Sequence, residues 1–273
     1  MTTPRKRLRK PLTRQTRMSV IRAGLWCLPA LLLGSTALWA QQGSVISTSA
    51  NAEAPFDLTG YWVSVVTQDW RFRMVVPGRG EYAGIPLNLK SKEFADAWDP
   101  KRDEAAGMQC EAYGAPTIMR EPGRLHITWQ NDNTLQVDTD TGMQTRLLHF
   151  KPSATEEAAA PSRQGYSVAQ WVLHANGASA ASPGKEIPRY GSAKIVTTRL
   201  LAGLLRKNGV PFSTQAKLTE YWEVDTQSAA DQWLVITIEL DDPDYLRIPY
   251  VVSAIFKKEA DGSKWDPSQC SFK

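Results

Sequence analysis

The sequence predicts an all-β fold, either an antiparallel β-barrel or a sandwich of nine or ten strands with one short helix. Three observations lead to this prediction. A long segment near residue 60 alternates between apolar and polar side chains, shorter segments of similar pattern follow at hairpin spacing, and only one stretch has a helical period. Successive side chains of a β-strand point to opposite faces of the sheet, so a period of two is typical of a strand with one buried face.

The opening segment, residues 61–76 (YWVSVVTQDWRFRMVV), predicts the first and longest strand. Its even-numbered face contains Trp62, Gln68 and Trp70, and the other face is charged in its second half. At roughly 3.3 Å per residue such a strand would be about 50 Å long, well beyond the usual length. We therefore expect it to bend near residues 67–69 and to line an apolar interior with its two indoles.

The remaining elements follow in chain order. Residues 88–98 have apolar side chains near one helical face and are followed by Pro100, which predicts a helix that ends there. Turn sequences rich in Gly, Pro, Asn and Asp separate the strands that come next. The predicted strands are residues 117–121, 124–129, 134–139, 144–150, 166–174, 194–201, 217–224, 232–240 and 245–256. Strands at this spacing are typical of barrels and sandwiches.

The first 40 residues have the features of a secretory signal peptide. They hold eight Lys and Arg residues, no acidic residue, and an apolar run that ends in small residues. A retained membrane anchor is the alternative. Cleavage after Ala40 fits this pattern, and Ala50-Asn51-Ala52 is a second candidate site. We expect a flexible tether over residues 41–55 and a single β-rich domain over residues 56–273. This domain would be periplasmic or secreted, with no stable membrane insertion after processing.

Removing the leader reverses the net charge of the chain. The whole sequence has 32 basic and 28 acidic residues, a net charge of +4. Eight of the basic residues and none of the acidic ones lie in residues 1–40, so the remainder has 24 basic and 28 acidic residues, a net charge of −4. A nucleic-acid surface needs Lys and Arg clustered on one face. The sequence therefore argues against a nucleic-acid-binding protein.

Two cysteines remain after processing, Cys110 and Cys270. In an oxidising compartment such a pair predicts a disulfide, and two unpaired thiols are the alternative. The sequence has no Cys-x-x-Cys and no two histidines at ligand spacing. We therefore expect no metal site and no cofactor.

Residues 217–224 place a carboxylate among apolar neighbours. Leu218, Glu220 and Trp222 share one face of this predicted strand. Burial there would raise the pKa of the Glu220 carboxyl and suit it to acid–base chemistry or to holding a ligand. The alternative has Thr219 and Tyr221 facing inward. The predicted interior ligand site consists of Trp62, Gln68, Trp70, His149, Glu220 and Trp222.

Two resemblances add to this prediction. Gly60-Tyr61-Trp62 is similar to the Gly-x-Trp motif of lipocalin-like (calycin) barrels, in which the tryptophan packs at the closed end. Most of the mature chain resembles a group of exported, uncharacterised proteobacterial and acidobacterial β-rich proteins, although Tyr166 stands where that group has a histidine. The second resemblance implies export and a shared architecture and assigns no catalytic residue. Its motifs are Cys110-x-x-x-Gly114-x-Pro116-x-x-Met119, Gly165-Tyr166-Ser167 with Trp171, Asn208-Gly209-Val210-Pro211-Phe212-Ser213, Leu218-Thr219-Glu220-Tyr221, and Asp242-Pro243-Asp244-Tyr245 followed by Pro249-Tyr250.

These features lead to one expected function and two alternatives. We expect an exported, lipocalin-like protein that binds a small apolar or aromatic molecule inside a barrel, because a barrel of this size can hold one small ligand. The first alternative is a periplasmic isomerase, cyclase or dehydratase on the same scaffold that uses Glu220 or His149. The second is an accessory partner of a periplasmic oxidoreductase.

Overall fold

The structure is a computed structural model that describes residues 48–273 except 154–157, 159, 175–189 and 229–230. The predicted signal peptide, its cleavage site and the first part of the predicted tether lie outside the described residues. In the part of the chain that is described, no helix is both long enough and apolar enough to cross a membrane.

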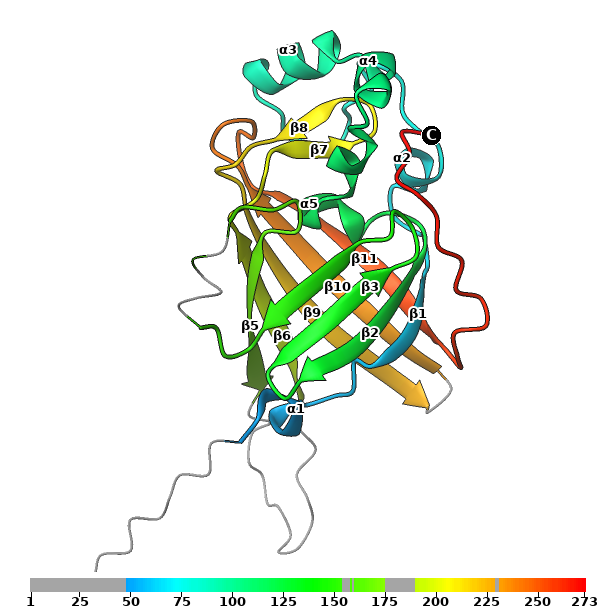
Figure 1. The fold of residues 1–273 in the computed structure, drawn as a ribbon, viewed down its shortest axis with the longest axis vertical. Helices are drawn as coiled ribbons and strands as arrows, with labels where there is room; N and C mark the ends of the chain where they lie inside the picture. The colour runs from blue at the N-terminus through cyan, green and yellow to red at the C-terminus, as the bar shows by residue number, and fades with distance from the viewer. Residues whose placement is uncertain (1–47, 154–157, 159, 175–189, 229–230) are drawn as a thin grey trace, which may run out of the picture. The chain divides into compact units, whose positions relative to one another are not determined.

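Nine strands close into a barrel, which confirms the predicted all-β barrel (Figure 1). They are β1 (Gly60–Ser64), β2 (Arg124–Asn131), β3 (Thr134–Thr139), β4 (Thr145–His149), β5 (Tyr166–His174), β6 (Tyr190–Thr198), β9 (Lys217–Ser228), β10 (Asp231–Asp241) and β11 (Tyr250–Glu259). Around the barrel the order is β1-β11-β10-β9-β6-β5-β4-β3-β2, and β1 pairs with β2 to complete the ring. Two more strands, β7 (Gly203–Arg206) and β8 (Val210–Phe212), form a separate hairpin.

One pair of neighbouring strands departs from the antiparallel arrangement that we expected. β4 and β5 run parallel, with Leu148 opposite Ser167 and His149 opposite Val168. The other eight pairs of the ring are antiparallel. A ring in which every neighbour reverses direction needs an even number of strands. Nine strands therefore require at least one parallel pair.

The predicted long strand over residues 61–76 is wrong beyond Ser64. The chain leaves the sheet there and turns at Asp69, whose φ of 50° lies in the left-handed region that Asp tolerates better than most residues. Residues Trp70–Met74 then form the short helix α2. Five residues are too few to separate a helical period from a strand period, and an ion pair from Arg120 to Asp69 at 2.8 Å fixes the turn.

The structure has more short helices than the single one that we expected. α3 (Leu89–Ala97) confirms the predicted helix, and Asn88 caps it by accepting a hydrogen bond from the backbone N–H of Ser91 at 2.9 Å. The others are α1 (Ala50–Glu53), α4 (Pro100–Ala105), the 3₁₀ helix η1 (Gln109–Tyr113) and α5 (Ala115–Ile118). The strand predicted over residues 117–121 is therefore wrong, since α5 occupies its start.

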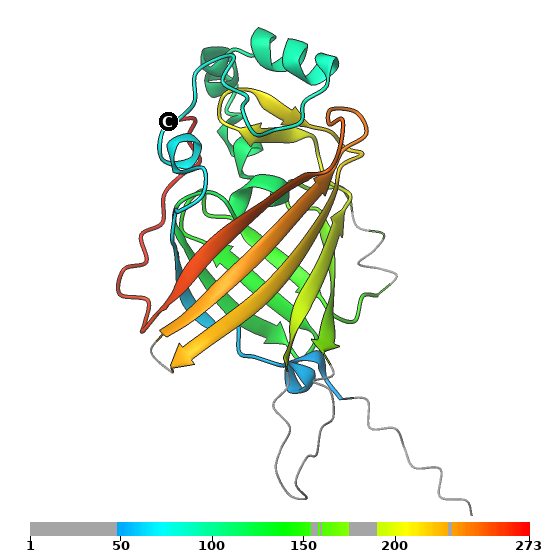
Figure 2. The same cartoon turned by 180° about the vertical axis from the view of Figure 1, so that it is seen from behind.

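These additional elements cover the two ends of the barrel (Figures 1 and 2). α2, α3, α4, η1, α5 and the β7–β8 hairpin lie over one end, and we call them the cap. α1 lies at the opposite end, where the Trp171 indole donates a hydrogen bond to the carbonyl oxygen of Ala50 at 2.7 Å. This part of the predicted flexible tether is therefore folded against the barrel.

The Cys110–Cys270 disulfide is present, as predicted, and the alternative of two free thiols is wrong. It joins η1 of the cap to the C-terminal segment, residues 260–273. This segment leaves β11 and runs along the outside of the barrel back to the cap (Figure 2). It pairs on the way with the β3–β4 turn, where the backbone N–H of Gly142 donates to the carbonyl oxygen of Ser268 at 2.9 Å.

Candidate functional site

The predicted interior site is only partly assembled. Trp62, Glu220 and Trp222 point into the barrel and are fully buried. The Trp62 indole donates a hydrogen bond to the carbonyl oxygen of Leu58 at 2.8 Å, which fixes this ring near the first strand. Large side chains from the facing strands, such as Phe256 of β11, fill the surrounding interior. Glu220 therefore lies in a densely packed core.

Glu220 has a partner that the sequence analysis missed, Arg146 of β4. The two exposed fractions are 0% and 1%. The Arg146 guanidinium donates through Nη2 to Oε2 at 2.6 Å and through Nη1 to Oε1 at 3.1 Å, which is a two-pronged ion pair across the barrel. Arg146 shares its strand face with Leu148, and this alternation could have revealed it. The inward face of that strand is ambiguous in the sequence, because Leu148 and Phe150 lie on one face and Leu147 lies on the other with His149.

The other three predicted site residues lie outside the barrel. The Gln68 side-chain oxygen accepts a hydrogen bond from the Ser253 hydroxyl at 2.6 Å, and Trp70 is 62% exposed on α2. Both follow from the early end of β1. His149 lies on the face of β4 opposite Arg146, where its ring stacks on Tyr166 at 4.9 Å. The structure therefore does not bring Gln68, Trp70 or His149 together with Glu220.

A cleft of about 450 Å³ lies instead between the cap and the C-terminal segment. We call it the rim cleft. Its walls come from α2 and the residues after it, from η1 to the end of the α5 turn, from the end of β7, and from the C-terminal segment. The lining residues are Phe72, Arg73, Met74, Val76, Pro77, Tyr113, Pro116, Thr117, Arg120, Glu121, Pro122, Thr141, Leu205, Arg206, Lys207, Tyr250, Ser268, Gln269, Ser271 and Lys273. Small-molecule sites typically have this volume.

Aromatic and aliphatic side chains supply the apolar part of the cleft. The rings of Phe72, Tyr113 and Tyr250 line it together with Leu205 and other aliphatic residues. A cation lies over two of these rings. The Arg206 guanidinium carbon is 4.5 Å from the centre of the Phe72 ring, and the Lys207 ammonium is 4.8 Å from the centre of the Tyr113 ring.

Basic side chains supply the polar part. Five basic residues and one acidic residue line the cleft, whereas residues 41–273 together have a net charge of −4. Two of the cations have carboxylate partners: Arg120 pairs with Asp69 at 2.8 Å, and Lys207 pairs with Glu121 at 2.8 Å. Burial lowers the pKa of Lys207, but the Glu121 carboxylate and the Tyr113 hydroxyl outweigh it, so the net shift is upward.

Two buried or half-buried arginines of the cleft lack such a partner. Within the described residues, neither Arg73 nor Arg206 has a carboxylate at ion-pair distance. Arg73 donates through Nε to the carbonyl oxygen of Arg120 at 2.8 Å, and Arg206 donates through Nη1 to that of Ala83 at 2.9 Å. Burial and the nearby Arg120 lower the pKa of Arg73 to about 10, and burial also lowers the pKa of Arg206.

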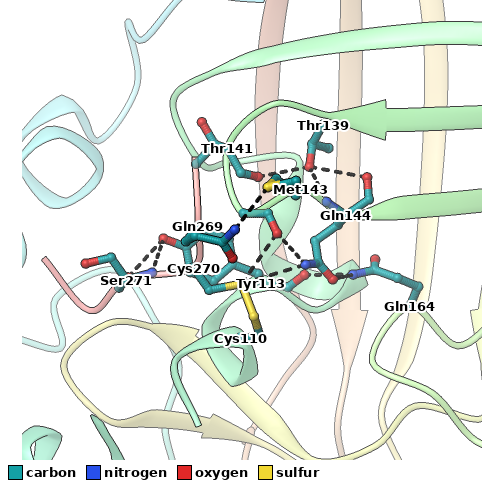
Figure 3. The surroundings of a disulfide bond; sticks show 11 residues. Cys110, Tyr113, Thr139, Thr141, Met143, Gln144, Gln164, Gln269, Cys270 and Ser271 are labelled. Atoms are coloured by element: carbon teal, nitrogen blue, oxygen red, sulfur yellow. Dashed lines mark hydrogen bonds between the residues drawn. A yellow bond between two sulfur atoms is a disulfide. The ribbon is translucent and has the colours of Figure 1, made fainter. Parts of the chain in front are cut away.

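The C-terminal wall of the cleft is held from two sides (Figure 3). The disulfide joins Cys270 to Cys110, and Tyr113 exchanges two hydrogen bonds with Ser271. Its hydroxyl donates to the Ser271 carbonyl oxygen at 2.9 Å and accepts from the Ser271 N–H at 3.0 Å. The same wall therefore depends on η1, which also supplies Tyr113 to the cleft.

No pattern in the sequence predicts the rim cleft, because its residues come from segments far apart in the chain. Groups of three or more His, Cys, Asp or Glu side chains suited to a metal ion do not occur in the described ranges.

No family model matches the chain, and neither a curated protein nor a solved structure matches it, so the two resemblances stay predictions.

Proposed function

We propose that the protein is an exported small-molecule-binding protein that holds an apolar or aromatic ligand in the rim cleft. The observation that carries this proposal is the cleft itself: about 450 Å³ lined by Phe72, Tyr113, Tyr250 and several polar groups. Ligand sites combine these properties, an apolar lining and a few fixed polar groups in a concave surface. The expected export and the periplasmic or extracellular location are part of the proposal.

The rim cleft supports this function better than the barrel interior does. Trp62 and Trp222 are themselves fully buried, and both oxygens of Glu220 accept hydrogen bonds from Arg146. A ligand there would have to displace packed indoles or break a buried ion pair, which is strongly unfavourable. The enzyme alternative loses support for a related reason, since both oxygens of Glu220 are bonded to Arg146 and neither Glu220 nor His149 lines the cleft.

A blocking substitution tests the proposal. Gln269 is exposed and lines the cleft, so Gln269→Trp adds an indole to its entrance. Gln215→Trp is the matched control, because Gln215 is equally exposed and does not line the cleft. The probes are indole, benzamide, benzoate and phenyl phosphate, and ligand-observed NMR measures their binding. Native mass spectrometry of the protein purified from its own host tests for a co-purifying molecule.

We expect at least one probe to bind to the unmodified protein and to the Gln215→Trp variant. Binding should fall by about tenfold or more in Gln269→Trp, since a filled pocket excludes the ligand. Equal binding by both variants would move the site away from the rim cleft. Absence of binding by all probes, together with no co-purifying molecule, would contradict the proposed function.

A further inference from the structure

The charged residues of the rim cleft indicate a narrower ligand class than aromatic molecules in general. Arg120 and Lys207 have carboxylate partners, whereas no carboxylate of the described residues lies at ion-pair distance from Arg73 or Arg206. These two donate to backbone carbonyl oxygens, and Arg206 also bonds the Tyr250 hydroxyl. A carbonyl dipole orients a guanidinium but does not neutralise its charge. Withdrawing an unpaired charge from water is costly, so natural proteins pair such groups or use them to bind a ligand.

Arg73 has a further unsatisfied group. Its Nη2 atom is buried and has no hydrogen-bond acceptor among the described residues. Its Nε is already occupied by the Arg120 carbonyl oxygen, and Arg120 itself is committed to Asp69 and to the carbonyl oxygen of Ser253. The Arg73 guanidinium, which belongs to a residue that lines the cleft, therefore has one donor without an acceptor among the described residues. Buried donors without acceptors are rare in folded proteins and call for a physical reason.

We propose that the rim cleft binds a small organic oxyanion, a carboxylate or a phosphate ester carried on an apolar or aromatic body. This inference rests on the proposed function and specifies its ligand class. The planar fork of a guanidinium matches the oxygens of both anions, and two unpaired arginines supply the missing counter-charge. Phe72, which lies against the Arg206 guanidinium, and Tyr250 would contact the body of the ligand.

The composition of the rest of the molecule supports a local role for this charge. The mature chain is acidic, yet the lining of the cleft is basic by five residues to one. A positive cleft in an otherwise negative protein concentrates field lines and attracts small anions to one place. Scattered surface lysines would not have this effect, because solvent and salt screen exposed charges.

The experiment compares charged and neutral probes of similar shape by isothermal titration calorimetry at low salt. The probes are benzoate, phenyl phosphate and the neutral benzamide. The variants are Arg73→Gln and Arg206→Gln, and the control is Arg247→Gln, because Arg247 is exposed and does not line the cleft. Comparison of benzoate with phenyl phosphate separates a carboxylate site from a phosphate site.

We expect at least one anion to bind about tenfold or more tightly than benzamide, in line with the strength of charge-assisted hydrogen bonds. Each cleft variant should weaken binding of that anion by about tenfold and change benzamide binding by less than about twofold. Arg247→Gln should leave all affinities unchanged. Without ligand, Arg73→Gln should melt no lower than the unmodified protein, since it removes a charge that burial disfavours and that Arg120 repels.

The failures of the two proposals can be told apart. If benzamide binds as tightly as the anions, or if Arg247→Gln weakens them as much as Arg73→Gln, the oxyanion inference is wrong and the small-molecule site stands. If neither anion binds, the oxyanion inference is wrong, and if indole and benzamide also fail to bind and no molecule co-purifies, both proposals fall. Should Arg206→Gln not fold, Arg206→Lys keeps the charge without the planar fork, and weaker binding of the anion that the unmodified protein binds supports the inference. Unchanged binding of that anion there and in Arg73→Gln contradicts it.

Discussion

At the scale of residues, the arginines of the barrel interior and of the rim cleft differ in whether a carboxylate compensates their charge. Arg146 is fully buried and both prongs of its guanidinium reach Glu220, so its charge is compensated inside the protein. Arg73 and Arg206 have no carboxylate of the described residues at ion-pair distance and donate to carbonyl oxygens, with the Tyr250 hydroxyl as a further partner of Arg206. A compensated pair is typical of a structural role, and an uncompensated cation in a cleft is typical of a binding role. We therefore assign Glu220 to stability and not to ligand binding.

Glu220→Gln should destabilise the protein strongly. The substitution leaves the Arg146 charge buried without a counter-charge, and breaking a buried pair from one side costs about 3–5 kcal/mol. We expect the free energy of unfolding, measured with urea, to fall by about 3 kcal/mol. The double variant Arg146→Met with Glu220→Leu should recover most of this loss, because apolar residues of similar volume can replace a buried pair.

The ligand probes provide the opposite readout for Glu220. Their affinity for a folded Glu220→Gln protein should equal that of the unmodified protein, since Glu220 does not line the rim cleft. A stable Glu220→Gln variant with weakened probe binding would support the ligand-binding role that the sequence predicts for Glu220.

At the scale of elements, period-two alternation predicted strands well where the chain stays in the sheet. The bounds of β3 and β5 match their predictions, and the end of β1 does not. The alternation of residues 70–76 is real, but it falls in a five-residue helix and a loop, because the turn at Asp69 redirects the chain toward Arg120. That contact joins residues 51 positions apart, and local pattern carries no information about it.

Gly142 in the β3–β4 turn lies against Tyr113, which lines the rim cleft. Gly142 has a φ of 74°, and a Cβ at this position would overlap the Tyr113 ring, which lines the rim cleft. Gly142→Ala should therefore lower the free energy of unfolding by more than the conformational cost of about 1–2 kcal/mol alone, and should weaken anion binding by displacing Tyr113.

Gly107→Ala is the matched control for this substitution. Gly107 has a φ of 72°, and a Cβ there would meet no atom within 4 Å, so the variant isolates the backbone cost. Urea denaturation and calorimetry with phenyl phosphate measure both effects. Equal losses of stability and unchanged binding in both variants would show that the contact with Tyr113 does not matter.

At the scale of the whole molecule, the barrel could be predicted and the cleft could not. The alternation that defines a strand is local, and it placed Trp62, Glu220 and Trp222 on inward faces. The rim cleft arises only when the cap, the start of β11 and the C-terminal segment meet over one end of the barrel. Arg73 and Arg206 are unremarkable in the sequence, because their lack of carboxylate partners is a property of the assembled structure.

The disulfide should therefore matter for stability and for binding together. It closes a loop with a sequence separation of 160, for which the chain-entropy model gives a stabilisation of about 5 kcal/mol. It also anchors the C-terminal wall of the cleft through Cys270. We expect the Cys110→Ser/Cys270→Ser variant to lose about 2–5 kcal/mol in urea denaturation and to bind the anionic probes about tenfold more weakly.

The barrel should survive this change, because none of its nine strands contains either cysteine. The β-sheet signal in circular dichroism is therefore expected to persist while the affinity falls. Reduction of the unmodified protein should reproduce both effects, and the same reductant should leave the Cys110→Ser/Cys270→Ser variant unaltered. Full anion affinity in the reduced protein would mean that Tyr113 and the pairing of Ser268 with the β3–β4 turn hold the wall of the cleft without the covalent link.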